Sequence, residues 1–244
     1  MPVRWMSATA TDQGPRRVMA DAAAAYRNRA NGHRAWSVAD GIGDDYEPAY
    51  AARSAARISA QAATRGGAAY GIATARRLLQ YEYEGAPRGQ AGDAVMVTAL
   101  PFPDAAGGGF DIAWVGDCRA YTVRGGALYQ ETDDHTQGAA MRQSATAWSR
   151  EIAPGYDHVV TRSVVRDTEI ASVRITGPVE RLLLCSDGVS KVLPAGVVAE
   201  ILTGTRCAAR AARALVAAAR SCPSARDNIA VTVLTPGHGR QHAR

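Results

Sequence analysis

The stretch Val38-Ala39-Asp40-Gly41 decides how this chain folds and what it holds, because it places a carboxylate at the end of an apolar run. Three further acidic stretches follow it in order: Val115-Gly116-Asp117-Cys118-Arg119, Leu184-Cys185-Ser186-Asp187-Gly188 and Arg226-Asp227-Asn228-Ile229. An aspartate at the end of a buried strand is costly unless its charge is compensated. Four such aspartates favour one shared compensator, and a divalent metal cluster held by carboxylate oxygens is the simplest.

These stretches resemble the ordered motifs of the bacterial metal-dependent Ser/Thr protein phosphatases, the PPM or type 2C family. A fifth stretch, Thr132-Asp133-Asp134-His135-Thr136, looks like the T-x-D-H-S element of that family. Any one motif would be weak, because Asp-Gly and Asp-Asn are ordinary turn pairs. Five motifs in the family's order are specific, and the resemblance runs from about Thr11 to Leu234.

The bulk composition predicts one compact domain over residues 1–236 and a short flexible tail over 237–244. The chain has 244 residues, 47% of them hydrophobic, and no Pro- or Ser-rich linker. It has no stretch of about 18 apolar residues, so we expect no membrane span. Residues 1–10 lack the pattern of a secretory signal. We therefore expect a cytoplasmic protein with reduced, structural thiols at its four cysteines, which are Cys118, Cys185, Cys207 and Cys222.

The formal charge of +5 and the pI near 9.2 raise the possibility of nucleic-acid binding. However, Lys191 is the only lysine, and the abundance of alanine and arginine is typical of codon bias in a GC-rich genome. Aromatic stacking partners are scarce, with only two Phe. We expect no nucleic-acid partner.

Hydrophobic patterns predict strands and two pairs of helices. The expected strands are Arg34–Val38, Ala94–Leu100, Phe110–Val115, Ala120–Val123, Ala127–Gln130, Ile170–Ile175, Arg181–Cys185 and Ala230–Leu234. Gly125-Gly126 predicts a two-residue hairpin turn. The expected helices are Pro48 to Tyr81, interrupted near Arg65-Gly66-Gly67, and the pair Ala195–Leu202 and Arg206–Ser221.

Hairpin-linked strands with helices gathered in pairs favour an α+β layered domain over alternating βαβ units. The resemblance implies the specific version, a four-layer α-β-β-α sandwich in which two antiparallel sheets are flanked by helix pairs. The metals would then lie at one end of the sandwich, where strand ends and turns meet.

The resemblance also implies the chemistry. Phosphate monoesters hydrolyse very slowly without a catalyst, and two metals about 4 Å apart can activate a shared water and stabilise the phosphoryl oxygens. Two Mn²⁺ or Mg²⁺ ions are implied, and a hydroxide bridging them would attack the phosphorus directly. Asp40 is the implied bridging ligand and Gly41 offers its carbonyl, while Asp187 and Asp227 would hold the other metal.

Three more residues take implied roles. Asp21 falls where an N-terminal R-x-x-N-E-D element of the family ends and is an implied metal residue, and Arg16 falls on that element's arginine. Arg16 would bind the substrate phosphate, although the adjacent Arg17 is an alternative. Asp117 matches a residue that supports a third, weaker metal in bacterial members; a purely structural role, tied to Arg119, is equally open.

Several positions depart from the family pattern. Met19-Ala20 replaces Asn-Glu, Asp44 replaces a glycine, and Ile42 stands where eukaryotic members carry a histidine. Gly92-Asp93-Ala94 replaces a small Gly/Ser-Thr segment. Lys191 occupies a position that is often acidic and helps to hold the third metal. A lysine there disfavours a cation, so we expect that third metal to bind weakly or not at all.

Two functions from different classes compete. The first is an Mn²⁺/Mg²⁺-dependent phosphatase that acts on phosphoserine or phosphothreonine in proteins, with a Ser/Thr kinase or its substrates as partners. The second is a catalytically weak or inactive relative that binds phosphoproteins or kinases and regulates them. Metal titration separates the two, because a regulator shows no Mn²⁺-dependent turnover.

Overall fold

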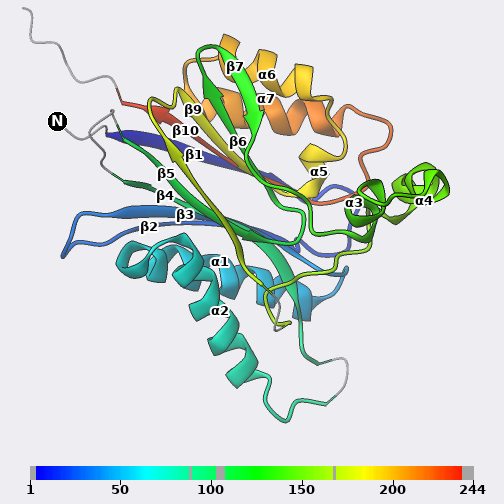
Figure 1. The fold of residues 1–244 in the computed structure, drawn as a ribbon. Helices are drawn as coiled ribbons and strands as arrows, with labels where there is room; N and C mark the ends of the chain where they lie inside the picture. Colours follow the sequence, from blue (N-terminus) through cyan, green and yellow to red (C-terminus); the bar gives the residue numbers. More distant parts are fainter. Residues whose placement is uncertain (1–3, 88–89, 103–107, 167–168, 238–244) are drawn as a thin grey trace, which may run out of the picture.

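Two five-stranded antiparallel sheets pack face to face in the computed structural model, which describes residues 4–87, 90–102, 108–166 and 169–237 (Figure 1). One sheet has the strand order β1 (Trp5–Asp12), β10 (Ile229–Pro236), β9 (Arg181–Cys185), β6 (Arg119–Arg124) and β7 (Ala127–Gln130). The other has the order β2 (Asp21–Arg27), β3 (Arg34–Gly41), β4 (Ala94–Phe102), β5 (Gly109–Val115) and β8 (Ala171–Thr176).

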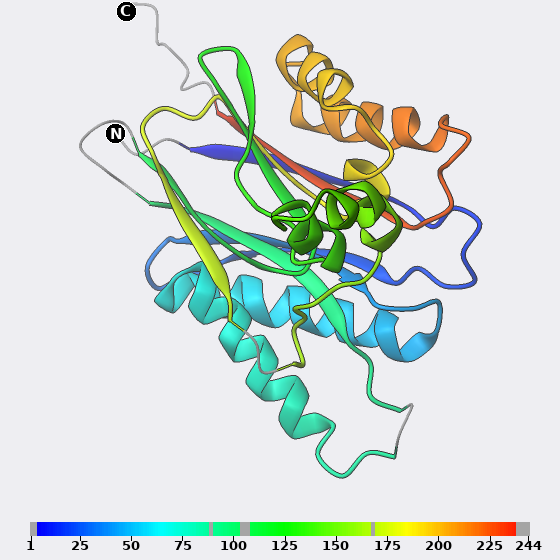
Figure 2. The ribbon, with the colours of Figure 1, turned by 45° about the vertical axis from the view of Figure 1, so that its right-hand side comes forward.

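A helix pair covers the outer face of each sheet, so the predicted α+β, four-layer α-β-β-α sandwich is confirmed (Figure 2). Helices α1 (Tyr46–Gly66) and α2 (Ala68–Glu82) pack on the β2–β5 sheet, and α6 (Ala195–Gly204) and α7 (Ala208–Arg220) pack on the other. The predicted interruption near Gly66-Gly67 is the junction of α1 and α2.

Three apolar layers hold the sandwich together. Large side chains such as Trp36, Phe110 and Leu184 fill the space between the sheets. The layer under α1 and α2 is built largely from alanine, which lets helix and sheet backbones approach closely. Burying each large apolar side chain contributes roughly 1.5–3 kcal/mol. The inter-sheet layer and the layer under α6 and α7, which buries Leu183, Leu202 and Leu215, therefore both stabilise the sandwich.

The sequence patterns missed both N-terminal strands. β1 and β2 are edge strands that pair only with β10 and β3 respectively. Their sequences, WMSATATD and DAAAAYR, are rich in Ala, Ser and Thr and poor in large β-branched residues. Their place in the sheets comes from tertiary pairing, not from local preference. The hairpin predicted at Gly125-Gly126 is confirmed, because Arg124 pairs with Ala127 across that turn.

A small helical segment was also not predicted. It comprises α3 (Gln137–Arg142), α4 (Ala147–Ile152) and the 3₁₀ turn η1 (Ala153–Tyr156), and it projects beside one end of the sandwich (Figures 1 and 2). Residues 238–244 of the predicted tail lie outside the described residues. No described helix is both long and apolar enough to cross a membrane.

Candidate metal centre

The predicted carboxylates meet at one end of the sandwich. Each comes from the end of a different strand or from the turn beside it: Asp40 on β3, Asp117 between β5 and β6, Asp187 after β9 and Asp227 before β10. Together with Arg16, which lies between β1 and β2, these four line a cavity of about 170 Å³. Residues spread over more than 200 positions of the chain thus face one small space.

Backbone packing explains why glycine follows two of the aspartates. A Cβ atom at Gly41 would overlap the carbonyl group of Pro48, and one at Gly188 would overlap the carbonyl oxygen of Asn228. Each Asp-Gly pair therefore lies where a second segment presses against the chain. The first contact joins the end of β3 to the start of α1, and the second joins the segments after β9 and before β10.

Asp21 and Asp40 form the inner part of the site. They are register partners on β2 and β3, and Asp21 is only 5% exposed. The Ser186 hydroxyl donates a 2.6 Å hydrogen bond to the Asp21 carboxylate. Asp21 does not line the cavity, so its charge acts on the site through its strand partner Asp40.

Burial is the largest cause of the pKa shifts of this inner pair. Burial raises the pKa of Asp21 to about 7, although the hydrogen bond from Ser186 opposes the shift. Burial, followed by the charges of Asp21 and Asp187, raises the pKa of Asp40 well above its ordinary range. The inner carboxylates therefore favour either a proton or another cation.

The outer part of the site contains its own cation. The Lys191 ammonium lies 2.5 Å from a carboxylate oxygen of Asp117 and 2.9 Å from one of Asp187. Burial lowers the pKa of Lys191, but these two carboxylates more than offset it and the net shift is upward. Burial and Asp187 raise the pKa of Asp117 to about 6, and Lys191 opposes that shift.

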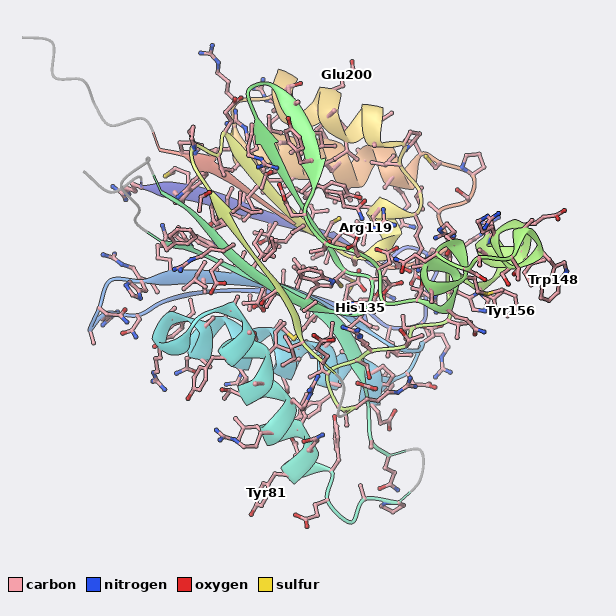
Figure 3. The ribbon with its side chains drawn as sticks, viewed as in Figure 1. Tyr81, Arg119, His135, Trp148, Tyr156 and Glu200 are labelled. Carbon is pink, nitrogen blue, oxygen red and sulfur yellow. The ribbon has the colours of Figure 1, made fainter. Side chains whose placement is uncertain are left out.

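These contacts settle the alternative in which Asp117 is tied to Arg119. Arg119 instead forms a two-bonded ion pair with Asp134, with nitrogen–oxygen distances of 2.7 and 2.6 Å. Figure 3 shows Arg119 close to the α3–α4 side of the molecule, above His135. The pairing of Asp117 with Arg119 is therefore wrong, and its partner is Lys191.

Arg16 binds the carboxylate on the remaining side. Its guanidinium Nη2 lies 2.6 Å from an Asp227 oxygen, and both side chains are about one-third exposed. Burial lowers the pKa of Arg16, but Asp227 outweighs this effect and the net shift is upward. Arg17 instead extends to Asp45 at 3.4 Å and is 71% exposed, so Arg16 is the arginine that faces the cavity.

Two of the departures from the family pattern have structural roles. The Asp44 carboxylate accepts hydrogen bonds from the backbone N–H groups of Arg17 and Val18, which fixes the connection that carries Arg16. The Asp93 carboxylate accepts a 2.6 Å bond from the Ser163 hydroxyl and one from the backbone N–H of Val165. These aspartates stabilise loops beside the cavity.

The chemistry of the donors fits hard divalent cations, since Asp40, Asp117, Asp187 and Asp227 supply carboxylate oxygens and Gly41 supplies a carbonyl. Within the described ranges, however, no three His, Cys, Asp or Glu side chains already stand in an arrangement that would hold a metal ion. Arg16 and Lys191 each occupy oxygens of the candidate ligands. Loading the site with metal therefore requires these ion pairs to open or rearrange.

The sequence reasoning missed several residues around the cavity. His158 and Val160, which follow η1, line it opposite the strand ends. His135 lies outside the cavity lining and stacks on Trp114 with ring centroids 5.8 Å apart. Trp148 and Tyr156 project from the outer side of the helical segment (Figure 3). Neither His158 nor Val160 has a spacing that would have revealed its place at the cavity.

Comparison with known proteins supports the fold and adds no close relative. No protein-family model and no curated protein sequence matches the chain. Among solved structures, the PPM Ser-Thr phosphatase MsPP from Mycobacterium smegmatis, in complex with cacodylate, has a TM-score of 0.76 at 24% identity, covering 97% of this chain and 100% of that one.

Two further structures give the same result. The Ser/Thr phosphatase Stp1 from Staphylococcus aureus has a TM-score of 0.82 at 17% identity, covering 98% of this chain and 97% of that one. The catalytic domain of the Ser/Thr protein phosphatase PstP, in complex with two manganese ions, has a TM-score of 0.72 at 20% identity, covering 95% and 97%. The resemblance inferred from the motifs is confirmed at the level of the fold.

Proposed function

We propose that the chain is an Mn²⁺- or Mg²⁺-dependent phosphatase that hydrolyses phosphoserine and phosphothreonine in proteins. The observation that carries the proposal is the meeting of four strand-end carboxylates with Arg16 around one cavity, in a chain with the PPM phosphatase fold. Phosphorylated proteins, such as a Ser/Thr kinase or its substrates, are the partners that this reaction implies.

The residues that would hold metal divide by position. Asp40 and the Gly41 carbonyl face the inner cavity, and Asp187 and Asp227 face it from the other sheet. Two ions bound there would supply charge neutralisation and an activated water for hydrolysis. Asp21 would act behind Asp40, where its charge favours cation binding.

Arg16 would bind the phosphate group of the substrate. A guanidinium offers two parallel donors to phosphate oxygens, and Arg16 is the arginine among the cavity-lining residues. Its bond to Asp227 would hold the guanidinium in place before substrate arrives. With Asp227 engaged as a metal ligand, the Arg16 donors that it now occupies would be available to the phosphate.

One specific observation favours the second candidate, a weak or inactive regulator. Lys191 and Arg16 already form ion pairs with three of the four cavity-lining carboxylates without any metal. A protein that stayed in this state would keep a phosphate-binding arginine and lack the metals needed for hydrolysis. Such a protein would bind phosphorylated partners without turning them over.

Hydrolysis of p-nitrophenyl phosphate by the purified protein separates the two candidates. Mn²⁺ would be titrated against an EDTA control, with Asp187→Asn as the site variant and Asp133→Asn as the control, since Asp133 is exposed and absent from the cavity lining. We expect turnover that requires Mn²⁺, survives in the control and is lost in the site variant. Absence of turnover in folded protein at millimolar Mn²⁺ would contradict the phosphatase and favour the regulator.

A further inference from the structure

Arg220 at the end of α7 lies behind the catalytic face and contacts two parts of the site at once. Its Nη2 atom lies 2.7 Å from a carboxylate oxygen of Asp12, at the end of β1, and donates a 3.1 Å hydrogen bond to the backbone carbonyl of Asp227. One side chain thus joins the segment that leads to Arg16 with the segment that carries its partner Asp227.

The loop between β1 and Arg16 is built around this guanidinium. Gly14 adopts a positive φ of 60°, and a Cβ atom there would overlap the Arg220 guanidinium. The Asp12 carboxylate, already paired with Arg220, also accepts a 2.8 Å hydrogen bond from the Gly14 N–H. The Gln13 side chain then donates to the Arg16 carbonyl, so the chain of contacts reaches the phosphate-binding residue.

Stability alone does not account for an arginine at this position. Two of its nitrogens, Nε and Nη1, are buried and have no hydrogen-bond partner among the described residues. Burying donors without partners lowers stability, and an apolar side chain would fill the same space without that cost. The contacts that Arg220 does make all lead to the segments that hold Arg16 and Asp227.

We propose that Arg220 is a positioning residue that fixes Arg16 against Asp227 by holding the 12–16 loop to the start of β10. The proposal rests on the phosphatase function for its kinetic test. Small displacements of a substrate-binding group weaken catalysis through lost orientation. Loss of the contact should therefore act on phosphate binding while the fold remains intact.

Arg220→Met tests this role, with Arg213→Met as the matched control. Arg213 and Arg220 lie on the same helix and line one surface groove between α7 and β1. The structure gives Arg213 no hydrogen bond to the described residues of the 12–16 loop. In Arg220→Met we expect the KM for p-nitrophenyl phosphate to rise roughly 10-fold with kcat nearly unchanged. The melting temperature should stay the same or rise. The control should leave all three values unchanged.

Gly14 provides an independent test from the other side of the contact. Gly14→Ala should raise KM as Arg220→Met does, whereas Gly32→Ala should not, because Gly32 has a similar φ of 76° with no atom near its Cβ position. In the Arg220→Met background the Gly14→Ala change should cost much less, since the overlap is gone. Fully additive effects would mean that the two residues do not act through one contact and would contradict the proposal.

Hydrogen exchange makes the test independent of activity. The backbone amides of residues 14, 16 and 17 should exchange faster in Arg220→Met than in the wild type or in Arg213→Met. Unchanged exchange and KM in Arg220→Met, or the same change in the control, would overturn the positioning role. If the wild type shows no turnover, the phosphatase proposal fails by itself, and the exchange result alone decides the role of Arg220.

Discussion

The inner and outer carboxylates of the cavity differ in how their charge is compensated. Asp117 and Asp187, on the outer side, share the ammonium of Lys191. On the inner side, Asp21 accepts a hydrogen bond from the Ser186 hydroxyl, and neither Asp21 nor Asp40 forms an ion pair with a described residue. Burial raises the pKa on both sides, and the lysine opposes the shift only on the outer one.

The contrast shows which part of the site depends on a cation from solution. The inner pair has no cation of its own. A bound metal would supply the positive charge that these carboxylates, buried away from water, lack. The outer pair already holds a cation, and a metal there must compete with a tethered ammonium. We therefore expect loss of the inner carboxylate Asp40 to reduce metal-dependent activity more than loss of the outer carboxylate Asp117.

The largest expected effect comes from Asp40→Asn compared with Asp117→Asn. Asp40→Asn removes the inner carboxylate that lines the cavity, and we expect Mn²⁺-dependent turnover to fall by on the order of 10³-fold. Asp117→Asn leaves Lys191 paired with Asp187, so the expected loss is about 10-fold. The comparison is of kcat/KM for p-nitrophenyl phosphate at saturating Mn²⁺. Equal losses in the two variants would contradict the division into inner and outer pairs.

The sequence predicted the site residues better than their environment. Asp40, Asp117, Asp187 and Asp227 could be identified because each stands at the end of an apolar run or before one. The partners of Asp117 and Asp187 were harder to foresee, because Lys191 meets Asp117 across 74 positions of the chain. Position 191 could be flagged as a misplaced charge, but its two-fold ion pair appears only in the folded chain.

The fold was predictable wherever local pattern and tertiary role agree. The strands β3, β4, β5 and β9 are mostly apolar and almost entirely buried because both of their faces are covered, and the alanine-rich helix pairs have clear periodicity. The edge strands β1 and β2 consist of small residues whose strand form depends on pairing with a neighbour. Arg220 escaped notice for a similar reason, since its regular spacing on α7 resembles a solvated helix face.

A smaller effect is expected from Lys191→Asp, which removes the outer cation and adds a carboxylate. The wild type should bind Mn²⁺ without a third ion, and the variant should bind one ion more because the new carboxylate at position 191 joins those of Asp117 and Asp187 as a ligand. Turnover should rise a few-fold, on the order expected for one added electrostatic contact. Isothermal titration with Mn²⁺ measures the stoichiometry.

Lys191→Gln provides the matched control, because it removes the charge without adding a ligand. It should bind Mn²⁺ with the wild-type stoichiometry. If Lys191→Asp binds no more Mn²⁺ than the wild type, then position 191 does not control a cation site, and the contrast between the inner and outer pairs does not extend to metal binding.

The smallest expected effect is on the stability of the metal-free protein. The pKa of Asp21 is about 7 in the folded chain, and a carboxyl group in an unfolded chain has a pKa of about 4. The folded state therefore holds its proton more tightly, so the stabilising contribution is complete at low pH and is lost as the pH rises from about 4 through 7. In EDTA the melting temperature should fall by a few degrees between pH 5 and pH 8.

Saturating Mn²⁺ should reduce that fall, because a bound cation favours the ionised carboxylates. Asp40→Asn should show a smaller fall without metal, while Asp133→Asn should follow the wild type. A melting temperature in EDTA that stayed constant or rose over this range would mean that the inner carboxylates are compensated without metal, which removes the reason for placing the essential cation there.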